Sequence, residues 1–305
     1  MLEKYHMKIM KFGGTSVGSG SKILHVAHII KGYFEKERIV VVISAMCGVT
    51  DTLVSIYGDF KEKNFTRGLK KLRSLFELHI NTLEELKFDR QEYETIKNLM
   101  KNLFGQLLTH LILQMNFSPR DYDYAISFGE KFSCLLLSKT LQKIGIQART
   151  VDSSQIIVTT NNFTNARALL DNTLEQAEMV LWPLIYKGTL PVVTGFYGAT
   201  EDGEIATLGR GGSDYSATIL AYVLDAQEVI LWKEVDGIFS GDPKKDKTVQ
   251  YYKELSYNHA LKLAQNGAKV LHREAMKPVM EKEIVVWVKN IFKPDLIGTK
   301  IWRGI

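Results

Sequence analysis

Residues 208–217 read Leu-Gly-Arg-Gly-Gly-Ser-Asp-Tyr-Ser-Ala, and this stretch is more informative about the chain than any other of its length. Its glycines let the backbone approach a charged ligand without a Cβ in the way. Ser213 is a good N-cap, so a helix is predicted to begin there and to continue through Asp214. A glycine turn that leads into a helix N-terminus indicates an anion site, because free N–H groups and the positive end of the helix dipole meet there.

Two charged side chains belong to this predicted anion site. Arg210 can hold a carboxylate or a phosphate through two parallel hydrogen bonds. Asp214 can orient a nearby cation with its carboxylate. Together the arginine and the aspartate indicate a site that handles two anionic groups at once.

The rest of the chain alternates short β-branched strands with helical segments. This alternation predicts βαβ units and a mostly parallel sheet that is covered on both faces. Leucines at helical spacing in residues 61–117 predict two long amphipathic helices, which form a helical lobe beside the sheet. The predicted strands lie at 8–12, 39–45, 148–152, 191–194, 228–232 and 284–290, and helices at 22–34, 164–187 and 256–266.

The first predicted strand brings Lys11 to its carboxyl end, directly before Gly13-Gly14-Thr15-Ser16. Ligands bind at that edge of open α/β sheets. Because the lysine precedes the glycines, the pattern differs from that of a P-loop. Taken alone, such a turn also fits an ordinary connection between a strand and a helix.

Other predicted strand ends also carry polar residues. The hydroxyls of Ser44 and Thr50 fit contacts to a polar substrate or the capping of the next helix. Residues 126–130 are expected to be a strand-to-helix junction, where Glu130 would complement the helix dipole. The loop 232–244 has two turn signals and could enclose a nucleotide base, and Lys269 follows a predicted helix.

These strand ends together indicate phosphoryl transfer. Lysines and backbone N–H groups neutralise a moving phosphoryl group, while carboxylates orient a lysine or hold Mg²⁺. Little covalent chemistry is asked of the protein in such a reaction.

The composition is that of an ordinary soluble globular protein, with 45% hydrophobic and 24% charged residues among 305. The formal net charge of +5 comes without a dense lysine and arginine stripe, so no nucleic-acid partner is expected. No apolar run of about 18 residues predicts a membrane span. Cys47 and Cys134 lack metal-site or redox spacing, and no histidine pair is spaced for a metal. We therefore expect a cytoplasmic protein without a metal site built from its own side chains.

Six segments, in this order, resemble the aspartate kinases of the amino-acid kinase superfamily over about residues 7–301. The resemblance implies an α/β fold of three layers, an α/β/α sandwich around a mainly parallel sheet. It also implies transfer of a phosphoryl group from ATP to L-aspartate, which begins lysine, threonine and methionine biosynthesis. The segments are Lys11-Phe-Gly-Gly-Thr-Ser-Val17, Ser44-Ala-Met46 with Thr50-Asp51, Phe128-Gly-Glu130, Gly209-Arg-Gly-Gly-Ser-Asp214, Val235-Asp-Gly237 with Asp242-Pro243, and Gly267-Ala-Lys-Val-Leu-His272.

The resemblance implies a role for each matching residue on the aspartate side. Glu130 would bind the ammonium group of aspartate, Arg210 would bind its α-carboxylate, and Thr50 would contribute a further contact. The β-carboxylate would then be the nucleophile. The same pocket would be lined by Gly211, Gly212 and Ser213.

On the phosphate side, the resemblance implies that Lys11 stabilises the transferring phosphoryl group and that Asp214 orients Lys11. ATP, with Mg²⁺, would be held by a phosphate-facing turn and by two later segments. The turn comprises Gly13, Gly14 and Ser16, and the later residues are Lys233, Glu234, Phe239, Asp242, Lys244, Lys269 and Val270.

The departures from the family pattern lie mainly on the nucleotide side. Lys233-Glu234 replaces a usual Thr-Asp pair and adds a positive charge near the expected base or ribose. Phe239 and Lys244 replace a frequent tyrosine and arginine, so a hydroxyl and a bidentate fork are lost. His272-Arg273-Glu274 also replaces the usual His-Pro-Arg. Aspartate binding is therefore better supported than nucleotide choice.

Family members commonly continue into paired ACT regulatory domains, whereas this sequence is expected to be one catalytic domain over 1–305. It would be either a natural catalytic-only form or a truncated one, and feedback through ACT domains of its own is not expected. The resemblance also makes a homodimer a reasonable expectation. Two alternatives stay open: a paralogue that acts on another small carboxylate or phosphonate, and a non-catalytic binding subunit that retains the pocket.

Overall fold

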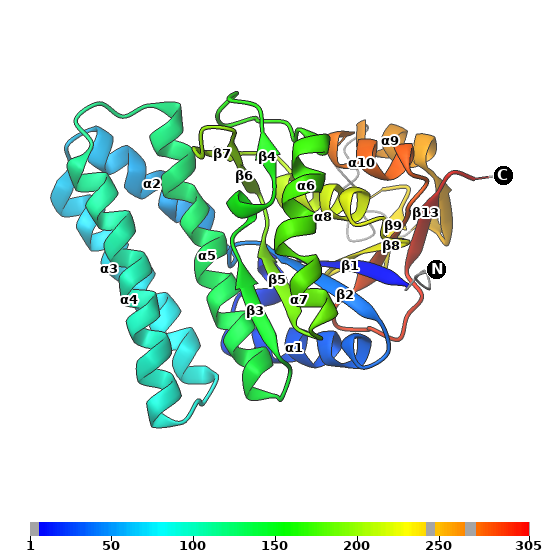
Figure 1. Cartoon of the computed structure of the whole chain (residues 1–305), viewed down its shortest axis with the longest axis horizontal. Coiled ribbons are helices and arrows are strands. Elements are labelled where there is room, and N and C mark those ends of the chain that lie inside the picture. Colours follow the sequence, from blue (N-terminus) through cyan, green and yellow to red (C-terminus); the bar gives the residue numbers. More distant parts are fainter. Residues whose placement is uncertain (1–5, 242–247, 266–272, 305) are drawn as a thin grey trace.

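An eight-stranded sheet forms the centre of the computed structural model, which describes residues 6–241, 248–265 and 273–304 (Figure 1). The strand order is β11-β13-β12-β8-β1-β2-β5-β3, and only the pairing of β12 with β13 is antiparallel. This confirms the mainly parallel sheet. The strands are β1 (Met7–Phe12), β2 (Arg38–Ile43), β3 (Ala148–Val151), β5 (Leu190–Thr194), β8 (Glu228–Lys233), β11 (Glu254–Ser256), β12 (Val285–Asn290) and β13 (Thr299–Trp302).

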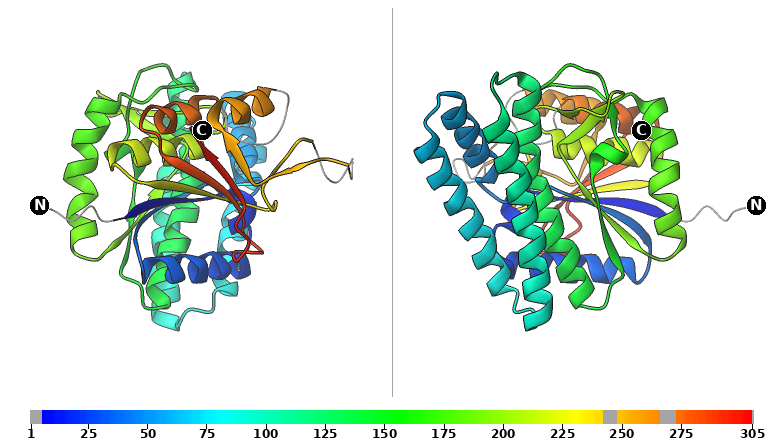
Figure 2. Two further views of the ribbon diagram at one scale, coloured as in Figure 1. Left: turned by 90° about the vertical axis from the view of Figure 1, so that its right-hand side faces the viewer. Right: turned by 60° about the vertical axis from the view of Figure 1, so that its left-hand side comes forward.

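Helices cover both faces of this sheet, as the three-layer prediction requires (Figure 2). One face packs against α1 (Gly20–Phe34) and α5 (Pro119–Lys143), and the other against α6 (Leu170–Val180), α7 (Trp182–Tyr186), α8 (Gly212–Val223), α9 (Tyr257–Gln265) and α10 (Arg273–Glu281). Side chains of a strand point alternately to the two faces. In β1, Met10 and Phe12 join the first core, while Met7 and Ile9 join the second.

The predicted helical lobe is present as α3 (Phe65–Glu85) and α4 (Arg90–Leu113), preceded by α2 (Val49–Lys61). The apolar stripe of α3 and α4 is buried against α2 and α5, which continues the core of one sheet face. Among the described residues, no helix is both long enough and apolar enough to cross a membrane.

The prediction for residues 126–130 is wrong, because they lie inside α5 and form no strand-to-helix junction. The helix begins eleven residues earlier, where Ser118 and Asp121 cap each other's backbone N–H groups and Pro119 takes the first position. Gly129, in the middle of this helix, serves close packing. A Cβ at this position would lie 2.7 Å from the Cβ of Ala45. Gly145 follows the end of α5 in the left-handed conformation, as is common for a glycine after a helix.

The helix after the glycine-rich segment begins one residue before the predicted cap. The N-cap of α8 is Gly211 and not Ser213, which lies in the first turn. Gly209 and Gly211 have positive φ angles of 72° and 75°, so the chain turns tightly enough for the Gly212 N–H to bond the Gly209 carbonyl. A serine cap is therefore not needed at this helix start.

The helix predicted over 164–187 is shorter and divided. Residues 164–169 are not helical, because Thr164 lies in a turn and the residues after it bond neighbouring strands, as Ala166 N–H does with the Thr207 carbonyl. Leu181 then separates α6 from α7. A three-stranded sheet in this region was not predicted. Its strands are β4 (Val158–Thr159), β6 (Tyr197–Thr200) and β7 (Ile205–Thr207). Elsewhere, β9 (Ile238–Phe239) pairs antiparallel with β10 (Tyr251–Tyr252).

Substitution of Gly129 by alanine tests the close packing of α5. We expect the free energy of unfolding to fall by about 1–3 kcal/mol, because overpacking against Ala45 outweighs the gain in helix propensity. Gly105 in α4 is the matched control, since nothing lies within 4 Å of a Cβ there. Gly105→Ala should stabilise by about 0.5–1 kcal/mol in the same urea titration. A Gly129→Ala variant as stable as Gly105→Ala would contradict the packing argument.

Candidate active site

One cavity of about 270 Å³ lies where the carboxyl ends of β1, β2 and β5 meet the N-terminus of α8. This is the edge at which open α/β sheets bind ligands. The cavity brings together residues that are as far apart in the sequence as 11 and 214. Its lining consists of Lys11, Ser44, Ala45, Thr50, Glu130, Phe196, Gly211, Gly212, Ser213 and Asp214.

The carboxylate of Asp214 lies between two lysines. Its Oδ1 is 2.7 Å from Lys11 Nζ, and its Oδ2 is 3.4 Å from Lys233 Nζ. The alternation of side chains along the strands explains this geometry, because the odd-numbered residues of β1 and β8 face α8. Adjacent strands therefore direct both ammonium groups to the first turn of α8.

Asp214 stays ionised in this setting although it is buried. Burial alone would raise the pKa of Asp214, but the ammonium groups of Lys11 and Lys233 outweigh it and lower this pKa to about 2. Two cations against one carboxylate leave positive charge available at this end of the cavity. Such a charge suits an incoming phosphate group.

Glu130 lies on the cavity lining opposite the sheet, in the middle of α5. Its Oε1 accepts a hydrogen bond of 3.0 Å from the backbone N–H of Ala45, which follows β2. Its Oε2 is buried without a hydrogen-bond partner among the described residues. Burial raises the pKa of Glu130 to about 8, although the Ala45 N–H and Lys11 favour the carboxylate. This orphaned acceptor suits a cationic ligand group.

Arg210 is exposed beside the cavity, at the turn that leads into α8. Its guanidinium makes no hydrogen bond or ion pair with any of the residues that the structure describes. The turn needs glycine on both sides of the arginine, since Gly209 and Gly211 both have positive φ angles. A Cβ on Gly212 would also lie 2.9 Å from the Phe196 ring. An unpaired arginine held on a tight turn is available to a carboxylate.

Three hydroxyl groups complete the lining of the cavity, those of Ser44, Thr50 and Ser213. Ser44 is fixed by its backbone, because its N–H bonds the Phe12 carbonyl and its carbonyl accepts from Ser133 Oγ at 2.7 Å. Each hydroxyl can donate or accept, so these side chains suit an oxygen-rich ligand.

The three residues of the predicted phosphate-facing turn lie in different environments. A Cβ on Gly13 would lie 3.8 Å from Lys11 Nζ, so this glycine is next to the cationic group. Gly14 packs directly on the chain after β2, where a Cβ would collide with the carbonyl oxygen of Ala45. Ser16 lies in a short 3₁₀ segment (Gly14–Val17) and is 2% exposed.

The predicted nucleotide residues are only partly brought together. Lys233 reaches Asp214, whereas Glu234 forms an ion pair of 3.3 Å with Lys22. Phe239 lies in β9 beside Tyr251 and lines a separate cavity of about 690 Å³. The remaining predicted residues, Asp242, Lys244, Lys269 and Val270, lie outside the described residues.

Comparison with known proteins matches the sequence profile of the "Amino acid kinase family" to residues 6–290. The chain belongs to the amino acid kinase family. Among its relatives, Aspartokinase 3, chloroplastic, of Arabidopsis thaliana is 38% identical over 99% of this chain and 54% of its own length. Lysine-sensitive aspartokinase 3 of Escherichia coli (strain K12) is 30% identical over 96% of this chain and 63% of its own length. This amino acid kinase thus spans about half the length of the plant relative.

The solved structures agree with the sequence relationship. E. coli aspartokinase III in complex with aspartate and ADP superposes with a TM-score of 0.90 and 29% identity. The match covers 98% of this chain and 65% of that one. The three-layer α/β architecture is therefore the amino acid kinase fold.

The described part of this amino acid kinase contains no group of three or more His, Cys, Asp or Glu residues that could hold a metal ion. Among the described residues that line this cavity, Asp214 is the carboxylate next to the predicted phosphate side, and two lysines already engage it. The residues therefore do not fit a metal site built by the protein alone. Mg²⁺ in kinases is commonly carried by the nucleotide phosphates.

Two contributors to the site were missed or misplaced by the sequence analysis of this amino acid kinase. Phe196 lines the cavity with a positive φ of 78°, which is unusual for a bulky residue. Its position after a strand, in Gly195-Phe-Tyr-Gly198, was the available signal. Lys233 was expected near the base or ribose, but its ammonium group reaches Asp214.

Proposed function

We propose that this chain transfers the γ-phosphoryl group of ATP to the β-carboxylate of L-aspartate, giving 4-phospho-L-aspartate. The observation that carries the proposal is the arrangement of opposite charges around one small cavity. The cationic end has Lys11 and Lys233 around Asp214, and the ionisable Glu130 lines the same cavity. Arg210 lies at the adjoining turn. The resemblance to an aspartokinase that binds aspartate and ADP supports the same assignment.

Aspartate has three charged groups, and the site offers a complement to each. The orphaned Glu130 Oε2 accepts from the ammonium group, while the unpaired Arg210 holds the α-carboxylate. The β-carboxylate then points toward Lys11. The hydroxyls of Thr50 and Ser213 are available to its oxygens. This orientation leaves one β-carboxylate oxygen free to attack.

In the proposed reaction, a β-carboxylate oxygen forms a bond to the γ-phosphorus as the bond to the bridging oxygen of ADP breaks. Lys11 neutralises the charge that develops on the transferring group. Asp214 holds the Lys11 ammonium in place, and Lys233 adds a second positive charge. We assign the backbone of Gly13 and Gly14 to the phosphates and propose that Mg²⁺ arrives with ATP; no step here depends on the ion.

The other nucleotide contacts remain proposals from the resemblance, including those of Glu234 and Phe239. Association into a homodimer is proposed on the same basis. A cytoplasmic location is supported by the two free cysteines, Cys47 and Cys134. The Arabidopsis relatives are named chloroplastic, so another reducing compartment is a second candidate.

A paralogue with another acceptor is the second candidate function, because Lys233 adds charge at the phosphate side where the family usually has threonine. Comparing small carboxylates and phosphonates as acceptors in one assay separates the two. A binding subunit without catalysis is disfavoured by the 2.7 Å contact of Lys11 with Asp214. Calorimetry that detects aspartate binding without turnover would favour it instead.

Hydroxylamine trapping of the acyl phosphate tests the proposed reaction. The protein should form hydroxamate in the presence of both ATP and L-aspartate, and Lys11→Met should lower kcat by about 10²–10³-fold or more, since the lost charge acts on the transition state. Lys8→Met is the matched control on the same strand, because Lys8 pairs with Glu37 and Glu228. Its kcat should be unchanged. Absence of aspartate-dependent hydroxamate from the unmodified protein would refute the function.

The pH dependence of aspartate use tests the assignment of Glu130. With a pKa of about 8, Glu130 is neutral below that pH and charged above it. Because only the carboxylate attracts an ammonium group, kcat/KM for aspartate should rise from pH 6 to 8, approaching about tenfold per unit at the acidic end, and level off above. Glu130→Gln should lower kcat/KM and flatten this profile. An unchanged inflection in Glu130→Gln would assign the titration to another group.

A further inference from the structure

Asp123 is a buried carboxylate with no role in the reaction proposed above. It is 0% exposed, and it lies on α5 seven residues before Glu130. Seven residues are close to two helical turns, so both acidic side chains lie on the same side of the helix. No lysine or arginine contacts Asp123 among the described residues, which sets it apart from Asp214.

Three hydrogen bonds satisfy the Asp123 carboxylate. Oδ2 accepts from the backbone N–H of Thr164 at 2.7 Å and from that of Thr207 at 2.8 Å. Oδ1 accepts from the hydroxyl of Thr207 at 2.7 Å. The carboxylate thus ties α5 to the last residue of β7, three positions before Arg210.

The second segment held by Asp123 packs on the same turn. Thr164 has a positive φ of 67°, a strained conformation for a β-branched residue. The next residue, Asn165, lies against Gly209, where a Cβ would approach the Asn165 side chain to 2.6 Å. Ala166 N–H also bonds the Thr207 carbonyl at 2.8 Å. The segment from Thr207 to Gly209 is therefore enclosed by groups that Asp123 fixes.

Arg210 directly follows the segment that these contacts hold. Its guanidinium is exposed and has no partner among the described residues, so only its backbone determines where it lies. We propose that Asp123 is a positioning residue, which fixes the Thr207–Arg210 segment and thereby sets the distance from Arg210 to Glu130. This rests on the proposed function, in which those two residues hold opposite ends of the amino acid backbone of aspartate.

The chemistry of the carboxylate explains why an amide is a weaker substitute. Two backbone N–H groups converge on one oxygen, and a hydroxyl donates to the other, so all three partners are donors. An asparagine presents one acceptor and one donor. If its oxygen accepts from the two backbone N–H groups, its NH₂ group faces the Thr207 hydroxyl, which must then turn to accept. Even in that arrangement all three hydrogen bonds become neutral, and charge-assisted hydrogen bonds are about twice as strong as neutral ones.

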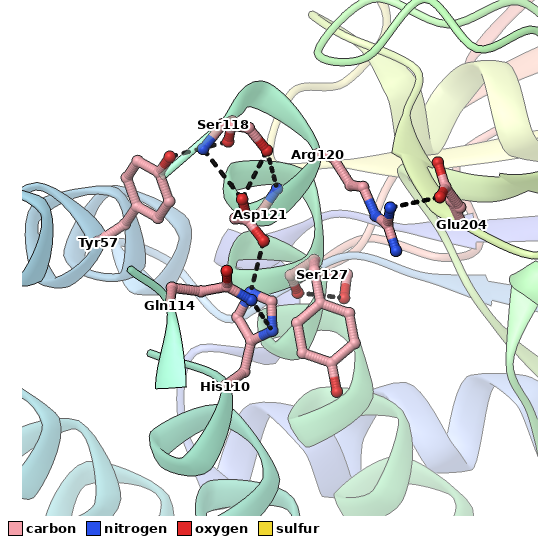
Figure 3. Close-up of polar contacts among 9 residues, drawn as sticks. Tyr57, His110, Gln114, Ser118, Arg120, Asp121, Ser127 and Glu204 are labelled. Atoms are coloured by element: carbon pink, nitrogen blue, oxygen red, sulfur yellow. Dashed lines mark hydrogen bonds and ion pairs between the residues drawn. The ribbon is translucent and has the colours of Figure 1, made fainter. Parts of the chain in front are cut away.

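A surface contact between the same elements provides the control. Arg120, also on α5, forms an ion pair with Glu204 at the turn between β6 and β7 (Figure 3). Figure 3 shows this pair beside the Ser118–Asp121 cap, at the start of the helix. The pair joins α5 to the hairpin that contains Thr207, but it does not contact the segment before Arg210. Glu204→Gln thus loosens the same junction without changing the enclosed segment.

Steady-state kinetics on the full chain test the proposal. Asp123→Asn should raise KM for aspartate on the order of 10–100-fold, while KM for ATP stays within twofold and kcat falls less than kcat/KM. Glu204→Gln should leave all three unchanged. In an Arg210→Ala background, Asp123→Asn should add little, because both changes act through one guanidinium. The proposal is overturned if the KM increases of the two single variants multiply in the double variant. It is also overturned if Asp123→Asn lowers only kcat.

A second variant and a second readout cover the remaining outcomes. If Asp123→Asn does not fold, Thr207→Val removes only the hydroxyl bond and should raise KM for aspartate by a smaller factor. Amide hydrogen exchange over 207–211 should accelerate in either variant and stay unchanged in Glu204→Gln. If the unmodified protein does not use aspartate, the proposed function fails, and the exchange rates still decide the positioning role. Unchanged exchange in the variants overturns it.

Discussion

The ionised carboxylate of Asp214 in a nearly buried position is the constraint on which the site depends. An isolated charge there would be very unfavourable, and the contacts to Lys11 and Lys233 compensate it. Both lysines must then leave their strands on the same face of the sheet. The parallel pairing of β1 with β8 meets this requirement, since Lys11 is opposite Leu231 and Lys233 follows two residues later. The register of two strands thus fixes the charge distribution at the phosphate side.

Helix α5 positions the side of the site that lies away from Asp214 and its two lysines. Glu130 accepts from the chain after β2, and Asp123 accepts from the chain before α8. One helix therefore fixes both segments that the proposed function assigns to the acceptor substrate. Gly129 lets the helix approach Ala45 closely, and the cap at Ser118 starts the helix early enough for both carboxylates to lie on it. The packing of α5 therefore also determines the geometry of the site.

Much of the fold could be predicted from local patterns, whereas contacts between distant segments could not. The β-branched run at 39–45 and the leucine spacing of 61–117 each indicated the correct element, because periodicity is a local property. Residues 126–130 were misassigned because Gly129 is required by close packing against Ala45, which is distant in the sequence. The helix predicted from 164 failed for the same kind of reason, since those residues bond to β4 and β7. Lys11, Glu130 and Asp214 were predicted from their motifs, and the structure brings them to one cavity. The presence of Phe196 there and the contact of Lys233 with Asp214 depend on the assembled sheet edge and could not be predicted locally.

A crystal structure of the protein with L-aspartate and ADP tests the central claim most directly. The account predicts aspartate in the 270 Å³ cavity, with its ammonium group on Glu130 and its α-carboxylate on Arg210. Its β-carboxylate should face Lys11, with the β-phosphate of ADP on the far side of that ammonium group. Aspartate bound outside this cavity, or bound with its α-carboxylate on Lys11, would contradict the account.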